Sequence, residues 1–498
     1  MGRDIIRGFL SILGGRVGRM VLSILVTPVL VRVLGSRGYG DYALVMSAMT
    51  LLMIVVNAGI FDGVRKYIAE ARAFPDWENH IFGFYTRLAG LFVSLVVLLI
   101  IALTSTGVIS WVFGHRFSTY FYVVAVLLIG NQFYELVRGA LMGFGQEHYS
   151  EPLVVLNKFL FSVVGVGLAY LGYGVTGALF GHLVATLVVT VVGGYFLKRH
   201  LSLSFVARPV PSEFPRRELF SFNAFSVVLI FLTMSLYHID ILLLQPLSGS
   251  EQTGQYKAAL VIAEFLWFVP MAVQLVLLQA TSELWANEDV DQITTIAARV
   301  TRYTLLLTLL MALGLAALAD PFVPLYFGPD FAAAIDPLLL LLPGVLGFAI
   351  ARPIYAIGQG KGDLRILILA TGIAALLNVV LNLLLIPRFG MYGAAIATSI
   401  GYGSMAGLHV WSARRIGFDP LADLRFGRIA VTAIGSAPVI LGAAYVIPWP
   451  LLALIVVPLL GFTVYVSLAV WTGALGTLET RRLLRRLPAP LNRLQRLL

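Results

Sequence analysis

The sequence predicts an all-α polytopic membrane protein of about fourteen transmembrane helices, and its composition, apolar stretches and internal repeat all support this. Of the 498 residues, 59% are hydrophobic and only 12% are charged, and the mean hydropathy is +0.91. A soluble fold could not bury that much apolar surface. Cysteine is absent, which excludes disulfides, thiolate-bound zinc and iron–sulfur clusters.

Apolar stretches of about 20 residues, the length that a bilayer core requires of a helix, recur along the whole chain. Arginines near the N-terminus interrupt the apolar core that a cleavable signal peptide would need, so we expect the first stretch to remain as a span. The predicted spans lie near 9–34, 41–62, 86–106, 118–143, 152–172, 175–197, 219–246, 256–282, 302–319, 331–357, 364–386, 392–412, 427–446 and 450–475.

Two halves of the chain repeat one pattern. Three pairs of segments match at offsets of 214, 213 and 216 residues: 40–42 with 254–256, 145–146 with 358–359, and 174–178 with 390–394. A parallel repeat of two multi-span halves is typical of transporters, in which the substrate path runs between the halves.

The repeat sets the predicted domains. They are an N-lobe at 1–207 with spans 1 to 6, a polar cytoplasmic linker at 208–218, a C-lobe at 219–426 with spans 7 to 12, spans 13 and 14 at 427–479, and a basic cytoplasmic tail at 480–498. Leucines alternate with arginines in the tail, which predicts an amphipathic helix on the inner leaflet.

Charge placement predicts the orientation, because short cytoplasmic loops collect Lys and Arg. With both termini cytoplasmic, all but five of the 35 Lys and Arg residues fall on the cytoplasmic side; the five are Arg32, Arg37, Arg116, Lys257 and Arg388. The net charge of +10 therefore reflects orientation and contact with anionic membrane lipids. We expect a multi-pass protein of the cell membrane and no nucleic-acid binding.

Cations within the predicted spans are candidate substrate contacts, because each costs about 2.5–3.5 kcal/mol at a helix centre. All start from cytoplasmic halves of spans, and together they would attract an anion such as a lipid pyrophosphate: Arg16, Arg19, Arg65, Arg138, Lys158 and Arg352. Snorkelling to the interface is the alternative for the first three. Ion pairs with Glu135 and Asp62 are the alternative for Arg138 and Arg65.

Several motifs carry a family resemblance. They are NVVLN at 378–382, LIPRFG at 385–390, GAAIAT at 393–398, RVLG at 32–35 followed by Tyr39-Gly40, and FGPDF at 327–331. Together they resemble the polysaccharide-biosynthesis flippases of the multidrug/oligosaccharidyl-lipid/polysaccharide superfamily. The resemblance implies two six-helix lobes that rock around a central cavity and move a lipid-linked oligosaccharide from the cytoplasmic to the outer leaflet. Aromatic and amide side chains would contact the sugars: Tyr42, Asn131, Gln132, Tyr134 and Gln274.

The resemblance also implies an ion-coupling site. In the lipid II flippase branch of the superfamily, a sodium site combines an acidic residue on span 7, two polar residues four apart on span 11 and a threonine on span 12. Asp240, Asn378, Asn382 and Thr398 are similar to it, except that the second position on span 11 is acidic there. The loss of one carboxylate weakens a site for a hard cation. Hydrogen bonding between helices, or proton binding at Asp240, is the alternative.

Three classes of function compete at this point. The first is a lipid-linked oligosaccharide flippase acting as a monomer, with no catalytic residue, metal or cofactor beyond a coupling Na⁺ or H⁺. The second is a multidrug cation antiporter of the same superfamily, which would favour an acidic, aromatic cavity. A membrane glycosyltransferase or polymerase ranks last, because it would need a large outer loop with catalytic carboxylates or histidines, and the predicted outer loops are short.

Overall fold

A computed structural model describes residues 2–70, 72–476 and 479, and for residues 2–13, 16 and 203 it describes the backbone alone. These residues form helices and turns, with no strand among them. The chain divides into two compact units. Unit 1 comprises Met1–Lys257 and Ile386–Met391, and unit 2 comprises Ala258–Leu385 and Tyr392–Leu498. The predicted all-α class is confirmed.

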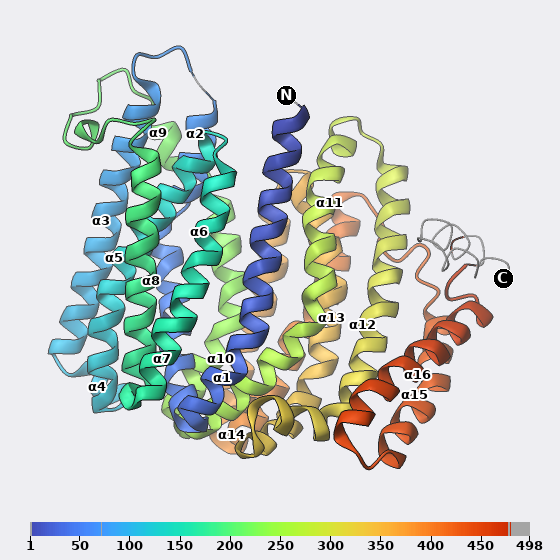
Figure 1. The fold of residues 1–498 in the computed structure, drawn as a ribbon. Helices are drawn as coiled ribbons and strands as arrows, with labels where there is room; N and C mark the ends of the chain where they lie inside the picture. Colours follow the sequence, from blue (N-terminus) through green and yellow to red (C-terminus); the bar gives the residue numbers. More distant parts are fainter. Residues whose placement is uncertain (1, 71, 477–478, 480–498) are drawn as a thin grey trace. The chain divides into compact units, whose positions relative to one another are not determined.

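Unit 1 is built from long helices that lie side by side (Figure 1). Its helices are α1 (Gly2–Asn57), α2 (Ile60–Ala69), α3 (Trp77–Ser105), α4 (Val108–Phe113), α5 (His115–Gly143), α6 (Glu147–Leu160), α7 (Val166–Leu168), α8 (Gly174–Leu197), α9 (Arg216–Ser221) and most of α10 (Ala224–Ala263). Helix α5 packs against α2, α3 and α8, and α6 packs against α1 and α8. A buried cluster that includes Tyr67, Trp77 and Tyr85 ties α2 to α3, and the Trp77 indole donates a 2.7 Å hydrogen bond to the Tyr67 carbonyl.

Unit 2 contains the remaining helices: α11 (Phe268–Ala286), α12 (Val290–Phe327), α13 (Ile335–Gly360), α14 (Arg365–Ile416, apart from Ile386–Met391), α15 (Phe426–Val446) and α16 (Pro450–Trp471). Helices α15 and α16 pack on each other and on α12. Arg302 of α12 is fully buried and bonds Asp423 at 2.5 Å and Glu479 at 2.6 Å. Although burial raises the pKa of the Glu479 carboxyl, hydrogen bonds from Arg302 and the Gly476 amide lower it overall. This cluster fastens the end of the last span to the bundle.

The repeat appears in the backbone as matched breaks. Gly35 (φ 65°, ψ 175°) interrupts α1 as Gly249 (φ 83°, ψ 173°) interrupts α10. Gly174 begins α8 with φ 52° and ψ −133°, and its repeat partner Gly390 interrupts α14 with φ 54° and ψ −130°. Positive φ is costly for residues with a Cβ, so glycine at equivalent places gives both halves the same turns. This confirms the internal repeat.

Ten helices in the described chain are long and apolar enough to cross a membrane. Four of them are double-length, spanning Val17–Asn57, Glu147–Leu197, Arg216–Ala286 and Arg365–Ile416. A glycine with non-helical dihedrals breaks each of the four, at Gly35, Gly172, Gly249 and Gly390. Division at these glycines agrees with the predicted pairs of spans, but the number of crossings, fourteen, stays a prediction.

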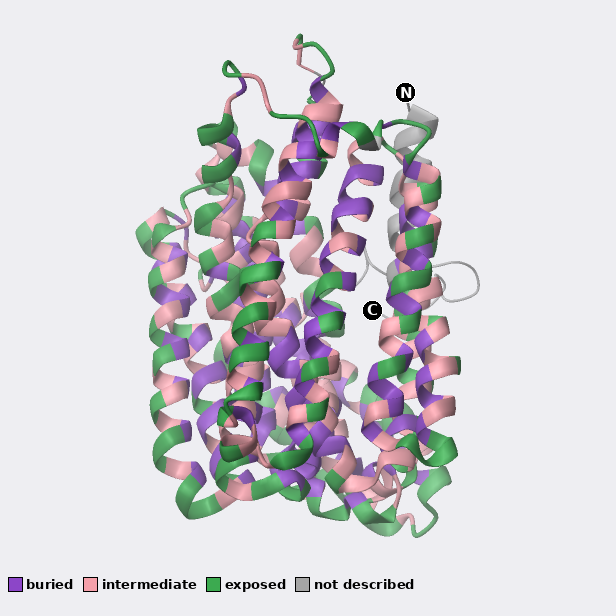
Figure 2. Cartoon of the chain, turned by 90° about the vertical axis from the view of Figure 1, so that its left-hand side faces the viewer, coloured by how far each residue is buried: buried purple, intermediate pink, exposed green. Residues whose placement is uncertain are grey.

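Apolar side chains on the outer faces of the helices match a membrane environment. Figure 2 shows exposed residues running along the helices as well as at their ends. On α3, Leu91, Leu95, Leu98 and Leu99 share one face and are 54–63% exposed. A continuous exposed face of leucines would be unstable in water and is stable against lipid. The chain is therefore a multi-pass membrane protein.

The unit boundary at Lys257 differs from the predicted lobe boundary, since span 7 at 219–246 groups with unit 1. The predicted lobes rest on equivalence between repeats, which is a different criterion, so their boundaries stay a prediction. The predicted amphipathic tail at 480–498 lies outside the described residues.

Candidate functional site

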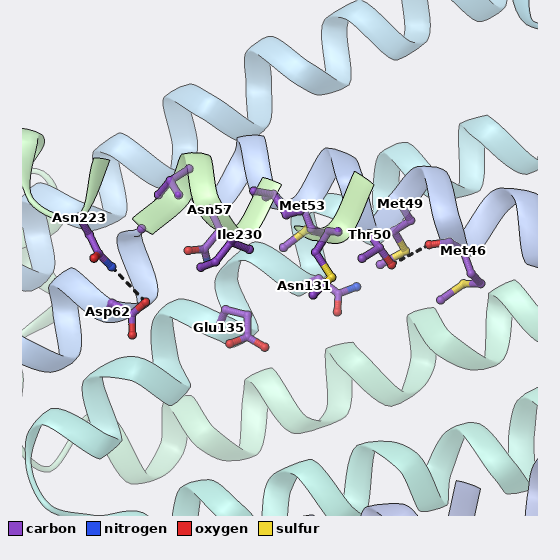
Figure 3. A pocket seen from close by; sticks show the side chains of 14 residues that line it. Met46, Met49, Thr50, Met53, Asn57, Asp62, Asn131, Glu135, Asn223 and Ile230 are labelled. Carbon is purple, nitrogen blue, oxygen red and sulfur yellow. Dashed lines mark hydrogen bonds between the residues drawn. The ribbon is translucent and has the colours of Figure 1, made fainter. Parts of the chain in front are cut away.

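Unit 1 contains an open pocket of about 390 Å³, whose lining side chains are drawn in Figure 3. The lining is a mixture of thioether, amide, carboxylate and aliphatic side chains. It comprises Met46, Met49, Thr50, Met53, Ile54, Asn57, Gly59, Asp62, Asn131, Glu135, Asn223, Val227, Ile230 and Met234. No lysine or arginine among the described side chains belongs to this lining.

Three helix faces supply most of the wall, as the spacing of the lining residues shows. Positions 46, 49, 50, 53 and 57 follow one face of α1, and positions 131 and 135 follow one face of α5. Positions 227, 230 and 234 lie along the start of α10 at intervals of three and four, and position 223 comes directly before this helix. Residues so spaced share a helix face, so the pocket is a product of helix register.

A tight turn after α1 brings the first carboxylate into the pocket. Ala58 and Gly59 both adopt positive φ, 42° and 83°, which ends α1 and starts α2 at Ile60. Asp62 then falls in the first turn of α2, where the helix dipole favours a negative charge. Its Oδ2 accepts a 3.3 Å hydrogen bond from Asn223 Nδ2, which Figure 3 shows.

Both pocket carboxylates have an arginine nearby. Asp62 lies 3.5 Å from Arg65, and Glu135 lies 3.5 Å from Arg138. Arg138 also bonds Glu151 of α6 at 3.0 Å. The sequence left ion pairing and substrate contact open for Arg65 and Arg138, and both ion pairs are present. Their role toward a substrate stays a prediction.

The other candidate cations are scattered. Arg19 is exposed on α1, and the side chain of Arg16 lies outside the described residues. Lys158 lies over the Phe161 ring at 5.1 Å.

In unit 2, Arg352 is buried. It donates a 3.0 Å hydrogen bond to Gln274 and lies 4.8 Å from the ring centres of Trp267 and Phe348. The faces of the two aromatic rings attract the cation and so help to stabilise it in its buried position.

Of the side chains expected to contact sugars, Asn131 lines the pocket. Tyr42 instead shares a 2.8 Å hydrogen bond with His182. Gln132 and Tyr134 neighbour Asn131 on α5 and are buried, and within the described chain the Gln132 amide and the Tyr134 hydroxyl have no hydrogen-bond partner. Gln274 contacts Arg352.

Three of the four predicted ion-coupling residues meet in unit 2. Asn378, Asn382 and Thr398 are fully buried; Asn378 Nδ2 donates to Thr398 Oγ1 at 3.4 Å, and Asn382 Nδ2 donates to the Asn378 carbonyl at 2.9 Å. The side-chain oxygens of both asparagines accept no hydrogen bond from the described residues. Asp240 belongs to unit 1, is fully buried and accepts a hydrogen bond from Tyr256.

The methionines and two asparagines of the pocket were missed by the sequence analysis. Met46, Met49 and Met53, with Asn57, recur at helical spacing in the second predicted span, which could have marked them as one face. Asn223 lies in the predicted span at 219–246 and was missed because a single uncharged polar residue near the start of a span does not stand out in the sequence.

Comparison with known proteins places this chain in a family. The family model described as polysaccharide biosynthesis protein matches residues 5–285, more than half of the chain, and the one described as lipid II flippase MurJ matches residues 153–458. Since each match covers more than half of the chain, the chain belongs to the family of polysaccharide biosynthesis proteins and lipid II flippases. The resemblance seen in its motifs is thereby confirmed.

Relatives of this flippase family occur in archaea. An uncharacterized membrane protein of Methanocaldococcus jannaschii is 23% identical over 60% of this chain, and the match spans 61% of that protein, less than two thirds. A probable low-salt glycan biosynthesis flippase, Agl15 of Haloferax volcanii, is 24% identical over 76% of this chain and 77% of its own length.

The fold has a solved counterpart. The structure of lipid II flippase MurJ in an inward closed conformation superposes with a TM-score of 0.73 at 14% identity, covering 94% of this chain and 99% of that one. At this identity the likeness is one of fold.

Proposed function

We propose that this protein is a flippase that carries a polyprenyl-(pyro)phosphate-linked oligosaccharide from the cytoplasmic to the outer leaflet by alternating access, for assembly of a cell-surface polysaccharide or glycan. The observation that carries the proposal is the match to a polysaccharide biosynthesis family model and a lipid II flippase family model, which between them extend from residue 5 to residue 458. The name of the Haloferax volcanii relative, a probable glycan biosynthesis flippase, supports it. The protein acts as a transporter and makes or breaks no covalent bond.

The substrate carries an anionic phosphate and a polar sugar portion, and the chain offers side chains for each. Guanidinium groups bind phosphate oxygens through paired, charge-assisted hydrogen bonds. The candidate cations Arg16, Arg19, Arg65, Arg138, Lys158 and Arg352 take this role in the proposal. The uncharged amides of the unit 1 pocket are suited to the sugar.

Coupling to an ion is a further part of the proposal. Two buried amide oxygens beside Thr398 provide the hard ligands that Na⁺ prefers, and Asp240 supplies a buried carboxylate that a proton or a cation can neutralise. Occupancy would favour one of two packings of the protein, which links ion binding to transport. The protein would work as a monomer in the cell membrane, with both termini cytoplasmic.

A multidrug cation antiporter is the second candidate, because the unit 1 pocket contains Asp62, Glu135 and four methionines. Methionine is common at binding surfaces that accept varied apolar ligands. Against it, each carboxylate already has an arginine at 3.5 Å. A ligand cation would have to compete with that arginine.

Depletion of the protein in its native cell distinguishes the two. A flippase predicts less surface glycan and an accumulation of lipid-linked oligosaccharide on the cytoplasmic leaflet, with unchanged sensitivity to lipophilic cations. Greater sensitivity to such cations with normal surface glycan would contradict the flippase and support the antiporter.

A further inference from the structure

The unit 1 pocket has spare hydrogen-bonding capacity. Asn57 Oδ1 accepts from the Phe61 amide at 3.3 Å, Asn131 Nδ2 donates to the Leu127 carbonyl at 2.9 Å, and Asn223 Nδ2 donates to Asp62. Each amide thus uses one of its two polar ends within the described structure. The other end, a donor at Asn57 and acceptors at Asn131 and Asn223, remains for a ligand.

The charge balance of the pocket favours an uncharged ligand. An anion would meet Asp62 and Glu135, which repel it, and no lysine or arginine among the described residues lines the pocket to offset that repulsion. An organic cation would find carboxylates that already interact with Arg65 and Arg138. Hydroxyl groups avoid both conflicts, because they donate to a carboxylate without bringing a charge of their own.

The apolar part of the lining also fits a sugar. Met46, Met49, Met53 and Met234 contribute flexible, polarizable side chains that can cover the C–H faces of a ring while amides and carboxylates bind its hydroxyl edge. A volume of about 390 Å³ lies low in the range of small-molecule sites, ~300–1,000 Å³, and suits a short saccharide without its prenyl chain.

We propose that this pocket binds an uncharged sugar residue of the lipid-linked oligosaccharide and discriminates against phosphate and against acidic sugars at that position. The inference rests on the proposed function and adds a division of labour to it. The sugar is bound by Asn57, Asp62, Asn131, Glu135 and Asn223, whereas the phosphate is bound by cations outside the lining of the pocket.

The absence of native cysteine makes a direct test simple. A Met53→Cys variant of the full-length protein in lipid nanodiscs places a single thiol in the pocket. The rate of its reaction with a maleimide is measured with farnesyl diphosphate bearing N-acetylglucosamine, with farnesyl diphosphate alone, and with the same carrier bearing glucuronic acid. We expect the first probe to slow the reaction and the other two to leave it unchanged at equal concentration.

A second substitution ties the protection to the amides. Asn131→Leu, added to Met53→Cys, should weaken binding of the N-acetylglucosamine probe by ~3- to 10-fold, the effect of losing one net hydrogen bond. Asn157→Leu is the matched control, because Asn157 bonds Thr186 at 3.4 Å and does not line the pocket. It should leave protection intact.

Equal protection by the bare carrier would overturn the inference, because the pocket would then bind diphosphate or prenyl chain. Protection by tetraphenylphosphonium but not by the sugar probe would overturn it in favour of a cation pocket. The proposed function is scored separately by flipping of the same probe in vesicles. Flipping without protection would refute the pocket assignment alone, and protection without flipping would refute the transport function alone.

Discussion

Gly40 and Gly254 are equivalent positions of the two repeats, and within unit 1 each packs against the segment that contains the other. We call these two segments, 36–40 and 250–254, the hairpins. A Cβ at Gly40 would lie 1.8 Å from the Ser250 carbonyl oxygen, and one at Gly254 would lie 1.9 Å from the Ser36 carbonyl oxygen. Ser36 and Ser250 are themselves repeat equivalents. Neither position can accept a side chain without moving backbone.

Around this contact lies a polar cluster. Arg116 bonds the buried carboxylate of Asp41 at 2.9 Å, and Gln245 donates to Asp41 at 3.3 Å and to Ser250 at 2.6 Å. The two hairpins are therefore held by backbone fit and by hydrogen bonds together. If the hairpins move apart during transport, this backbone contact and these hydrogen bonds have to break.

Substitution of either glycine tests the contact. Gly40→Ala and Gly254→Ala should each destabilise the protein by about 1–3 kcal/mol, the usual effect of overpacking, measured as a lower melting temperature in detergent. Gly314→Ala is the control, because a Cβ there meets no atom within 4 Å and alanine favours a helix. If all three variants had the same melting temperature, the close approach of the hairpins would be wrong.

Topology can be tested with single cysteines in the naturally cysteine-free chain. Thiols at the exposed positions Arg37, Glu251 and Pro448 should react with an impermeant maleimide added to intact cells. A thiol at exposed Ser212 in the linker should react only after the cells are opened. Protection at any outer position, or labelling at Ser212 in intact cells, would show that a span has been miscounted.

The candidate cations predict a charge-dependent loss of transport. Replacement of Arg16, Arg19, Arg65 and Arg352 by alanine together should reduce transport by ~10-fold or more, because a hydrogen bond to a charged group contributes about 1.5–3 kcal/mol. Insertion and melting temperature serve to separate this effect from misfolding. Arg217→Ala, in the exposed linker, is the control. Unchanged transport by the fourfold variant would remove these residues from the phosphate site.

The buried carboxylate of Asp240 predicts that transport is coupled to an ion. Asp240→Asn should slow transport and abolish any dependence on sodium or pH, because the uncharged amide has no negative charge for a proton or a cation to neutralise. Tyr256→Phe, which removes the hydrogen bond to Asp240 but keeps the carboxylate, should preserve the ion dependence. Normal transport by Asp240→Asn with intact ion dependence would leave Asp240, Asn378, Asn382 and Thr398 as polar residues of helix packing.

Much of the fold was predictable because spans and repeats produce recognisable patterns in the sequence. The apolar stretches give the helices, and repeated glycines such as Gly174 and Gly390 give the turns that both halves share. Helix-local pairs were also predictable: Arg65 with Asp62, and Arg138 with Glu135, are three residues apart.

The pocket was less predictable because it depends on how separate helices meet. Asn131 was a candidate, but its neighbours in the pocket come from α1, α2 and α10, and no local pattern reports that register. Arg138 likewise bonds Glu151 across two helices. The sequence predicted a cavity with cations, and the carboxylates of this pocket, Asp62 and Glu135, became apparent only from the way the helices pack.

Transbilayer movement of substrate measured in vesicles tests the central claim most directly. Purified protein is reconstituted with a fluorescent, short-chain prenyl-diphosphate oligosaccharide, and the fraction of probe accessible to an impermeant quencher is followed over time. We expect protein-dependent movement of the probe that is reduced by ~10-fold or more in the fourfold arginine variant. Movement at the rate of protein-free vesicles, under a sodium or a proton gradient of either direction, would contradict it.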